Sequence, residues 1–248
     1  TRTDLDYPMA DGSTALRFEK AVFTAFELYI LKRPGAENDY SGAEQQAAKQ
    51  RFEQMNEAEI TKVTQNIIAG LPGGTTEGLA TLANFQAVLD TYNGIDAKQM
   101  QSNLIDFLKE IIPVADEADV KMAIHPDDPP YSLFGLPRVV STAQDLRDIA
   151  NMVDSPVNGF TLCSGSLGVR ADNDVPAILQ EQADRVHFLH LRNTTLEADG
   201  ASFHEDAHLE GDTDMVRLVD IILDIEAKRG EQLPFRPDHG HAMLSDLR

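Results

Sequence analysis

The second half of the chain alternates between two spacings of apolar positions. Short apolar runs, typical of buried strands, occupy 120–124, 159–162, 185–189 and 233–236. Around them, apolar residues recur every three or four positions, as on one face of a helix: Met100, Leu104, Phe107, Leu108 and Ile111, then Leu146, Ile149 and Met152, then Met215, Leu218, Val219 and Ile222. This alternation predicts right-handed β-α-β units and a parallel sheet.

Boundary residues support the predicted helices. Helices are expected to begin near Asp96 and Thr142. A third helix carries Pro176 near its first turn, and the last is expected to stop at Gly230. Four strands are half of the eight that a closed (β/α)₈ barrel needs, so 96–248 is expected to form half a barrel.

Residues 1–95 show little strand pattern and are expected to be helices and loops. Residues 41–44 form a capping box that opens a helical stretch continuing to Ile68. This stretch is then interrupted by Gly70, Pro72, Gly73 and Gly74. We expect 1–95 to pack on the barrel half within one domain; a separate small helical domain is the alternative.

Composition narrows the class of protein. The net charge of −20 argues against a nucleic-acid partner, because such a field repels phosphate. No apolar run approaches the roughly 20 residues of a membrane helix, and the chain begins without a secretory signal pattern. We therefore expect a cytoplasmic protein without a membrane partner. Cys163 is the single cysteine, so no internal disulfide can form.

Each predicted strand ends at or near a residue that can bind a metal. These residues are His125, Cys163, His190 and Asp238. Each alone has a structural interpretation, as a core or surface histidine, an inert cysteine or a turn-capping aspartate. Four of them at consecutive strand ends predict one metal site, because the carboxyl ends of parallel strands share an edge. Imidazole, thiolate and carboxylate together suit Mn²⁺, Fe²⁺, Co²⁺ or Zn²⁺ better than Mg²⁺ or Ca²⁺.

The strand ends also carry long motifs, and so does the first half of the chain. They are His-Pro-Asp-Asp-Pro-Pro at 125–130, Gly-Phe-Thr-Leu-Cys-Ser-Gly-Ser at 159–166, His-Leu-Arg at 190–192, Arg-Pro-Asp-His-Gly-His at 236–241, Leu-Lys-Arg-Pro-Gly-Ala at 31–36, Asn-Ile-Ile-Ala-Gly-Leu-Pro-Gly at 66–73 and Val-Arg-Ala-Asp-Asn-Asp at 169–174. With these motifs the chain resembles the mannonate dehydratases from end to end.

The resemblance implies a xylose-isomerase-like TIM (β/α)₈ barrel, incomplete in this chain, with a helical inserted region. It implies dehydration of D-mannonate to 2-keto-3-deoxy-D-gluconate in hexuronate (glucuronate) catabolism, with Mn²⁺ or Fe²⁺. It makes His125, Cys163, His190 and Asp238 the metal ligands and His239 a catalytic acid/base. The family's first barrel strands and a C-terminal tyrosine proposed for catalysis have no counterpart here.

Further residues are candidates for contacts with the substrate. Arg170, Arg192 and Arg236 lie in loops after strands or at strand ends, where a guanidinium can bind a substrate carboxylate with two hydrogen bonds. The polar segment 203–208 is expected to be a loop, either a lid or a solvated connection. A tight turn at Gly240 is expected to let neighbouring side chains reach one pocket.

Two other functions stay open at this point. A sugar isomerase on the same scaffold is one, although such enzymes usually rely on carboxylate-rich ligand sets. An inactive metal-binding fragment is the other. The expected partner is a small sugar acid, and a homo-oligomer is possible.

Overall fold

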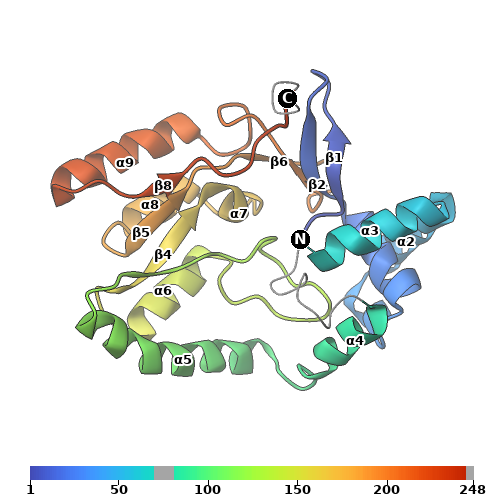
Figure 1. Cartoon of the computed structure of the whole chain (residues 1–248), viewed down its shortest axis with the longest axis horizontal. Coiled ribbons are helices and arrows are strands. Elements are labelled where there is room, and N and C mark those ends of the chain that lie inside the picture. Colours follow the sequence, from blue (N-terminus) through green and yellow to red (C-terminus); the bar gives the residue numbers. More distant parts are fainter. Residues whose placement is uncertain (70–80, 244–248) are drawn as a thin grey trace.

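A parallel sheet lies at the centre of the computed structural model, which describes residues 1–69 and 81–243. Its strands run in the order β3 (Met122–Ile124), β4 (Asn158–Cys163), β5 (Val186–His190) and β8 (Phe235–Arg236). Every neighbouring pair is parallel, and the order follows the chain (Figure 1). The predicted parallel sheet and its four strands are therefore confirmed.

Four predicted helices lie close to their predicted positions. They are α5 (Ala97–Glu117), which precedes β3, and α6 (Ala143–Met152), α8 (Val175–Glu181) and α9 (Met215–Arg229), which connect the strands. The short helix α7 (Ser164–Gly168), directly after β4, was not predicted. Asp96 and Thr142 cap α5 and α6 as expected, and Gly230 ends α9 in a left-handed conformation. Leucine and isoleucine side chains of these helices bury Phe160 and Leu162 of β4 in one core.

The first half of the chain contains the expected helices. They are α1 (Lys20–Ala25), a π-helical turn (Phe26–Leu31), a 3-10 turn (Ala36–Asp39), α2 (Gly42–Gln54), α3 (Glu57–Ala69) and α4 (Leu82–Asp90). The capping box at Ser41 and Glu44 is present, but the helical stretch is divided, because the backbone at Met55 is extended. Gly70, Pro72, Gly73 and Gly74 lie outside the described residues.

A second, antiparallel sheet corrects two expectations. It joins β1 (Asp4–Pro8) and β2 (Thr14–Phe18) to β7 (Phe203–Glu205) and β6 (Thr194–Leu196). The first residues of the chain are therefore strands, and the segment 203–208 begins with a strand. The strand signals were weak because these strands are only three to five residues long. The two local pairs, β1 with β2 and β6 with β7, are joined into one sheet by the pairing of β2 with β7, such as Arg17 with His204, nearly 190 positions apart.

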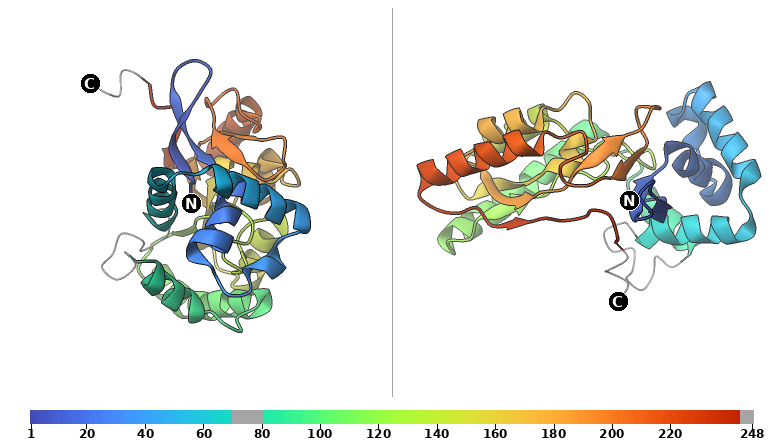
Figure 2. Two further views of the ribbon diagram at one scale, coloured as in Figure 1. Left: turned by 90° about the vertical axis from the view of Figure 1, so that its right-hand side faces the viewer. Right: turned by 90° about the horizontal axis from the view of Figure 1, so that it is seen from above.

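The helices of the first half lie at one end of the molecule, and α9 with the parallel sheet lies toward the other (Figure 2). Phe134, from the loop after β3, contacts Phe23, Phe26 and Phe85 and so joins the helical end to the sheet end. Within the described residues, no helix is long and apolar enough to cross a membrane.

Candidate metal centre

Three of the predicted ligands converge at the carboxyl edge of the parallel sheet. His125 directly follows β3, while Cys163 and His190 end β4 and β5 and are direct register partners. One possible ligand atom from each of the three lies within 4.8 Å of the others. The closest histidine contact, from His125 Nε2 to His190 Nδ1, is 3.2 Å. The parallel register thus brings together side chains that are 27 to 65 positions apart.

Asp238, the fourth predicted ligand, lies beside this cluster. Its Oδ2 is 3.6 Å from His190 Nδ1, and its side chain is 5% exposed. The backbone at Asp238 is left-handed, with φ of 37°. This bend lies at Asp238 itself, whereas the sequence predicts a tight turn at Gly240. A bend at a non-glycine residue next to a candidate site is a recurring feature of functional loops.

His239 occupies the rim of the same region. Its Nε2 is 3.7 Å from Asp238 Oδ1, and its side chain is 47% exposed. It lines a pocket of about 350 Å³ together with Asp128, Arg2 and Asn66. An exposed imidazole next to a buried carboxylate is well placed to meet a ligand entering this pocket.

Electrostatics favour a thiolate at Cys163. Burial raises the pKa of this thiol, but hydrogen bonds with His125 and His190 and the charge of Arg192 lower it to about 5. Burial lowers the pKa of His125, but its contacts with Cys163 raise it above the ordinary value. The thiolate is the form that binds metals, so the donor set of two imidazoles and a thiolate fits a transition-metal ion.

Arg192 is buried rather than exposed to a ligand. Its side chain is 1% exposed, with Nε 2.7 Å from Glu205 Oε2 and Nη1 3.0 Å from Asp128 Oδ2. Burial opposes ionisation of Asp128, but the charges of Arg2 and Arg192 hold its pKa well below the usual range. The backbone packs closely here, since a Cβ on Gly165 would lie 2.6 Å from Arg192 Nε.

Asp128, Arg2 and Glu205 were not among the sequence candidates. Asp128 belongs to the motif that begins with His125, so its position three residues after a candidate ligand was a usable signal. Arg2 and Glu205 lie on segments about 200 positions apart, and nothing in their local sequence connects them.

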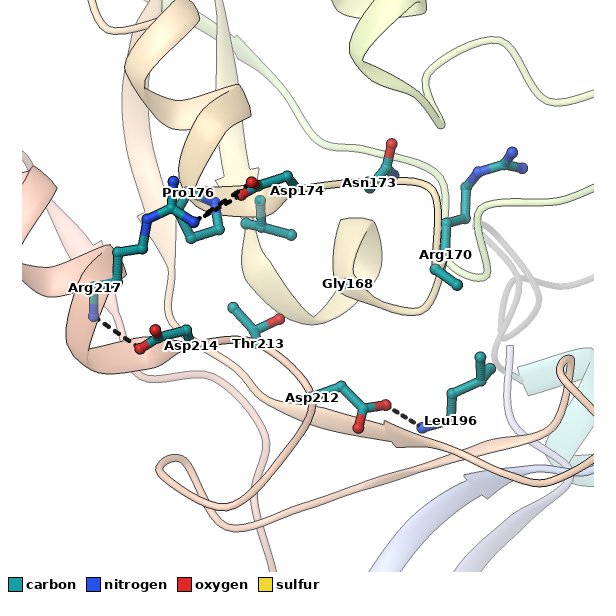
Figure 3. A pocket seen from close by; sticks show the side chains of 12 residues that line it. Gly168, Arg170, Asn173, Asp174, Pro176, Leu196, Asp212, Thr213, Asp214 and Arg217 are labelled. Atoms are coloured by element: carbon teal, nitrogen blue, oxygen red, sulfur yellow. Dashed lines mark hydrogen bonds and ion pairs between the residues drawn. The ribbon is translucent and has the colours of Figure 1, made fainter.

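Arg170 lies at a different hollow, of about 320 Å³ (Figure 3). It forms two hydrogen bonds with Asp172, of 2.9 and 2.6 Å. Across this hollow Arg217 points toward Asp174, and the Asp212 carboxylate accepts a hydrogen bond from a backbone amide. The charged side chains there are already paired, and none of the three clustered ligands lines it among the described residues.

The other predicted residues lie as follows. Arg236 is exposed and donates from Nη2 to Asp238 Oδ1 at 2.9 Å. His204 is in β7, with Nδ1 3.3 Å from Glu197. His208 Nε2 lies 2.7 Å from the carbonyl oxygen of Pro237, so the segment 206–212 contacts the chain just before Asp238.

A parallel β/α sheet with imidazole, thiolate and carboxylate groups at its carboxyl edge defines an α/β protein with a candidate metal site. Comparison with known proteins identifies the family. The family model of D-mannonate dehydratase (UxuA) matches residues 1–248, and the chain belongs to this family.

The relatives carry the same description. The chain is 53% identical over 248 residues to the mannonate dehydratases of Brucella melitensis biotype 2 and of Brucella canis. These matches cover 99% of this chain and 62% of each relative, so the chain spans less than two thirds of their length. The crystal structure of mannonate dehydratase from Streptococcus suis serotype 2 is similar, with a TM-score of 0.69 and 32% identity, over 99% of this chain and 55% of that one.

Proposed function

We propose that this chain provides the metal-binding part of a hydro-lyase that converts D-mannonate to 2-keto-3-deoxy-D-gluconate in the cytoplasm. The observation that carries the proposal is the convergence of His125, Cys163 and His190 at one sheet edge, with Asp238 beside them. Membership of the D-mannonate dehydratase family and the names of the relatives support the substrate and the reaction.

The proposed scaffold is a TIM barrel of the xylose-isomerase-like type. Strands in chain order, joined by helices, are the arrangement of a barrel segment. Within the described residues β3 and β8 are the edges of the sheet, and unpaired edges need partners. We propose that the additional length of the relatives corresponds to strands that pair at these edges.

The proposed metal ligands are His125, Cys163, His190 and Asp238, and the proposed ion is Mn²⁺ or Fe²⁺. Two imidazoles, a thiolate and a carboxylate are donors that these ions accept. When bound, the ion would supply positive charge that stabilises the sugar acid as negative charge develops next to its carboxylate. The fixed register of β4 and β5 holds two of the ligands in place before any ion binds.

His239 is the proposed acid/base. The reaction removes the C2 proton and the C3 hydroxyl of the substrate, releases water, and forms an enol that becomes the 2-keto acid. His239 Nε2 faces the Asp238 carboxylate at 3.7 Å, so Nδ1 is the proposed ring nitrogen that exchanges a proton with the substrate. The exposure of the imidazole is consistent with this role.

Arginines have proposed roles in binding the sugar acid. Arg236 is the best placed to meet the substrate carboxylate, because its side chain is 59% exposed beside the proposed ligand Asp238, with which it shares a single hydrogen bond through Nη2. Arg170 and Arg192 are engaged by carboxylates of the protein. We propose that these two act on the substrate through the loops that they hold.

The test is an assay of the complete gene product that contains this chain. With Mn²⁺ bound, it is expected to release one 2-keto-3-deoxy acid per D-mannonate consumed, detected by a colorimetric keto-deoxy-acid assay. His190→Ala should lose bound metal and activity together. His187→Gln, on the same strand but hydrogen-bonded to Pro156, is the matched control and should keep both. Isomerisation of a sugar without loss of water, or metal binding with no turnover, would contradict the proposal.

A further inference from the structure

The pocket beside His239 is lined by two charged residues, Arg2 and Asp128, to which the proposed reaction assigns no role. The pocket, of about 350 Å³, is lined by Thr1, Arg2, Leu5, Leu16, Asn66, Ala69, Asp128 and His239. Its volume lies in the range of small-molecule sites. Leucine and alanine side chains give it an apolar side, and Asp128 is the carboxylate among the lining residues.

Asp128 belongs to a closed ring of two arginines and two carboxylates. Arg2 donates to Asp128 through both terminal nitrogens, at 3.1 Å each, and to Glu205 Oε1 at 2.7 Å. Arg192 completes the ring with its bonds to Asp128 and Glu205. The two positive and two negative charges balance, which is how charged groups are accommodated away from water.

The members of this ring differ in their access to a ligand. Arg192 and Glu205 are 1% and 0% exposed, whereas the Asp128 side chain is 23% exposed. A ligand in the pocket therefore meets the exposed part of the Asp128 carboxylate, whose Oδ2 accepts two of the ring's bonds and whose Oδ1 accepts one. Arg2 also lines the pocket, and its Nε has no hydrogen-bond partner among the described residues.

The charge of Asp128 determines which end of a sugar acid it can receive. A carboxylate accepts hydrogen bonds from hydroxyl groups, and these charge-assisted bonds are strong. It repels another carboxylate, so the acid end of the substrate must point away from it. Arg192 Nη1, which holds Asp128, is also 3.9 Å from Cys163 Sγ, so the hydroxyl-accepting group is held at a fixed place relative to the candidate ligands.

We propose that Asp128 binds a hydroxyl group on the tail of the sugar acid, at C4, C5 or C6, and thereby determines specificity and orientation. The buried Arg2–Glu205–Arg192 framework keeps its carboxylate in place. This inference rests on the proposed function, because the identity of the ligand as a polyhydroxy acid comes from it.

The experiment measures binding by calorimetry in the complete gene product loaded with Mn²⁺ and carrying His239→Asn, so that D-mannonate is bound but not converted; wild type and variant below refer to residue 128 or 205 in this background. The ligands are D-mannonate and three analogues that lack the hydroxyl at C4, C5 or C6. The wild type is expected to bind one analogue about 10- to 100-fold more weakly than D-mannonate, the range for a hydrogen bond to a charged group. Asp128→Asn should bind D-mannonate more weakly by a similar factor, keep its metal, and no longer distinguish that analogue.

Two further variants separate binding from folding. Glu205→Gln alters the same ring at a buried position, so it should lower the melting temperature but keep the discrimination. If Asp128→Asn fails to fold, Asp128→Glu retains the charge, displaces the carboxylate by one methylene, and should lose the discrimination. Parental discrimination in the folded Asp128 variants, or an equal loss in Glu205→Gln, would overturn the inference.

Failure of the proposed function would look different. A gene product with His239 intact that binds D-mannonate without dehydrating it contradicts the proposed reaction, while the affinity ratios still decide the role of Asp128. A wild type that binds none of the four sugar acids overturns the inference on Asp128 as well.

Discussion

Replacing Cys163 with serine tests the metal centre directly. The thiol has a pKa of about 5 and is therefore a thiolate at neutral pH, whereas a serine hydroxyl stays protonated. The change is small in volume, and serine can still accept the amide hydrogen bond that Cys163 receives from Ser166. The variant is therefore expected to fold while it loses one of the anionic donors.

The expected loss of metal affinity in Cys163→Ser can be worked out by dividing the binding free energy of the ion among its four proposed ligands. Four-ligand zinc sites bind with about 10–16 kcal/mol, so an equal share for one ligand is roughly 2.5–4 kcal/mol. At about 1.4 kcal/mol per factor of ten, this corresponds to a loss of roughly 10²- to 10³-fold in affinity. The individual share depends on the ion, but a softer ion should lose more when sulfur is removed.

The assay is competition between the protein and a chelator of known affinity, with bound metal measured by elemental analysis. His187→Gln, a histidine on β5 outside the cluster, serves as control and should bind metal like the wild type. Unchanged metal affinity in both Cys163→Ser and His190→Ala would refute the assignment of this cluster as the metal site.

The other predictions concern catalysis, pH and packing. His239→Asn should keep its metal and lose most of its turnover, while Asp238→Asn should lose both. Turnover at the wild-type rate in His239→Asn would show that His239 has only a structural role. Metal affinity should fall as pH drops through the histidine range, beginning earlier than for an ordinary histidine because the pKa of His125 is raised, and a pH-independent titration would contradict this. Gly165→Ala should destabilise the fold by about 1–3 kcal/mol, seen in denaturant unfolding, because its Cβ would collide with buried Arg192.

The ion pairs around Arg192 show what local sequence patterns do not predict. The sequence predicted Arg192 as a substrate ligand because an arginine after a strand usually lies at the site. In the folded chain Glu205 comes from β7 and Arg2 from just before β1, and together with Asp128 they enclose its guanidinium. Arg2 precedes the local β1–β2 hairpin, and only the pairing of β2 with β7, such as Arg17 with His204, brings Glu205 to it, so no short window contains the information.

Local patterns were sufficient for the elements that carry the candidate ligands. The helices from Asp96 onward are amphipathic and capped by their own neighbouring residues, and the strands β3, β4, β5 and β8 are short apolar runs. Because consecutive parallel strands end at one edge, their order alone predicted that His125, Cys163 and His190 would meet.

Only the tertiary structure determined which residues surround the candidate ligands at the carboxyl edge of the parallel sheet. The left-handed backbone at Asp238, the pocket beside His239 and the burial of Arg192 depend on contacts between segments far apart in the chain. Spacing along a strand or helix reports which face a side chain occupies. It carries no information on which distant charge will neutralise it, because that choice is made by packing when the sheets and helices come together.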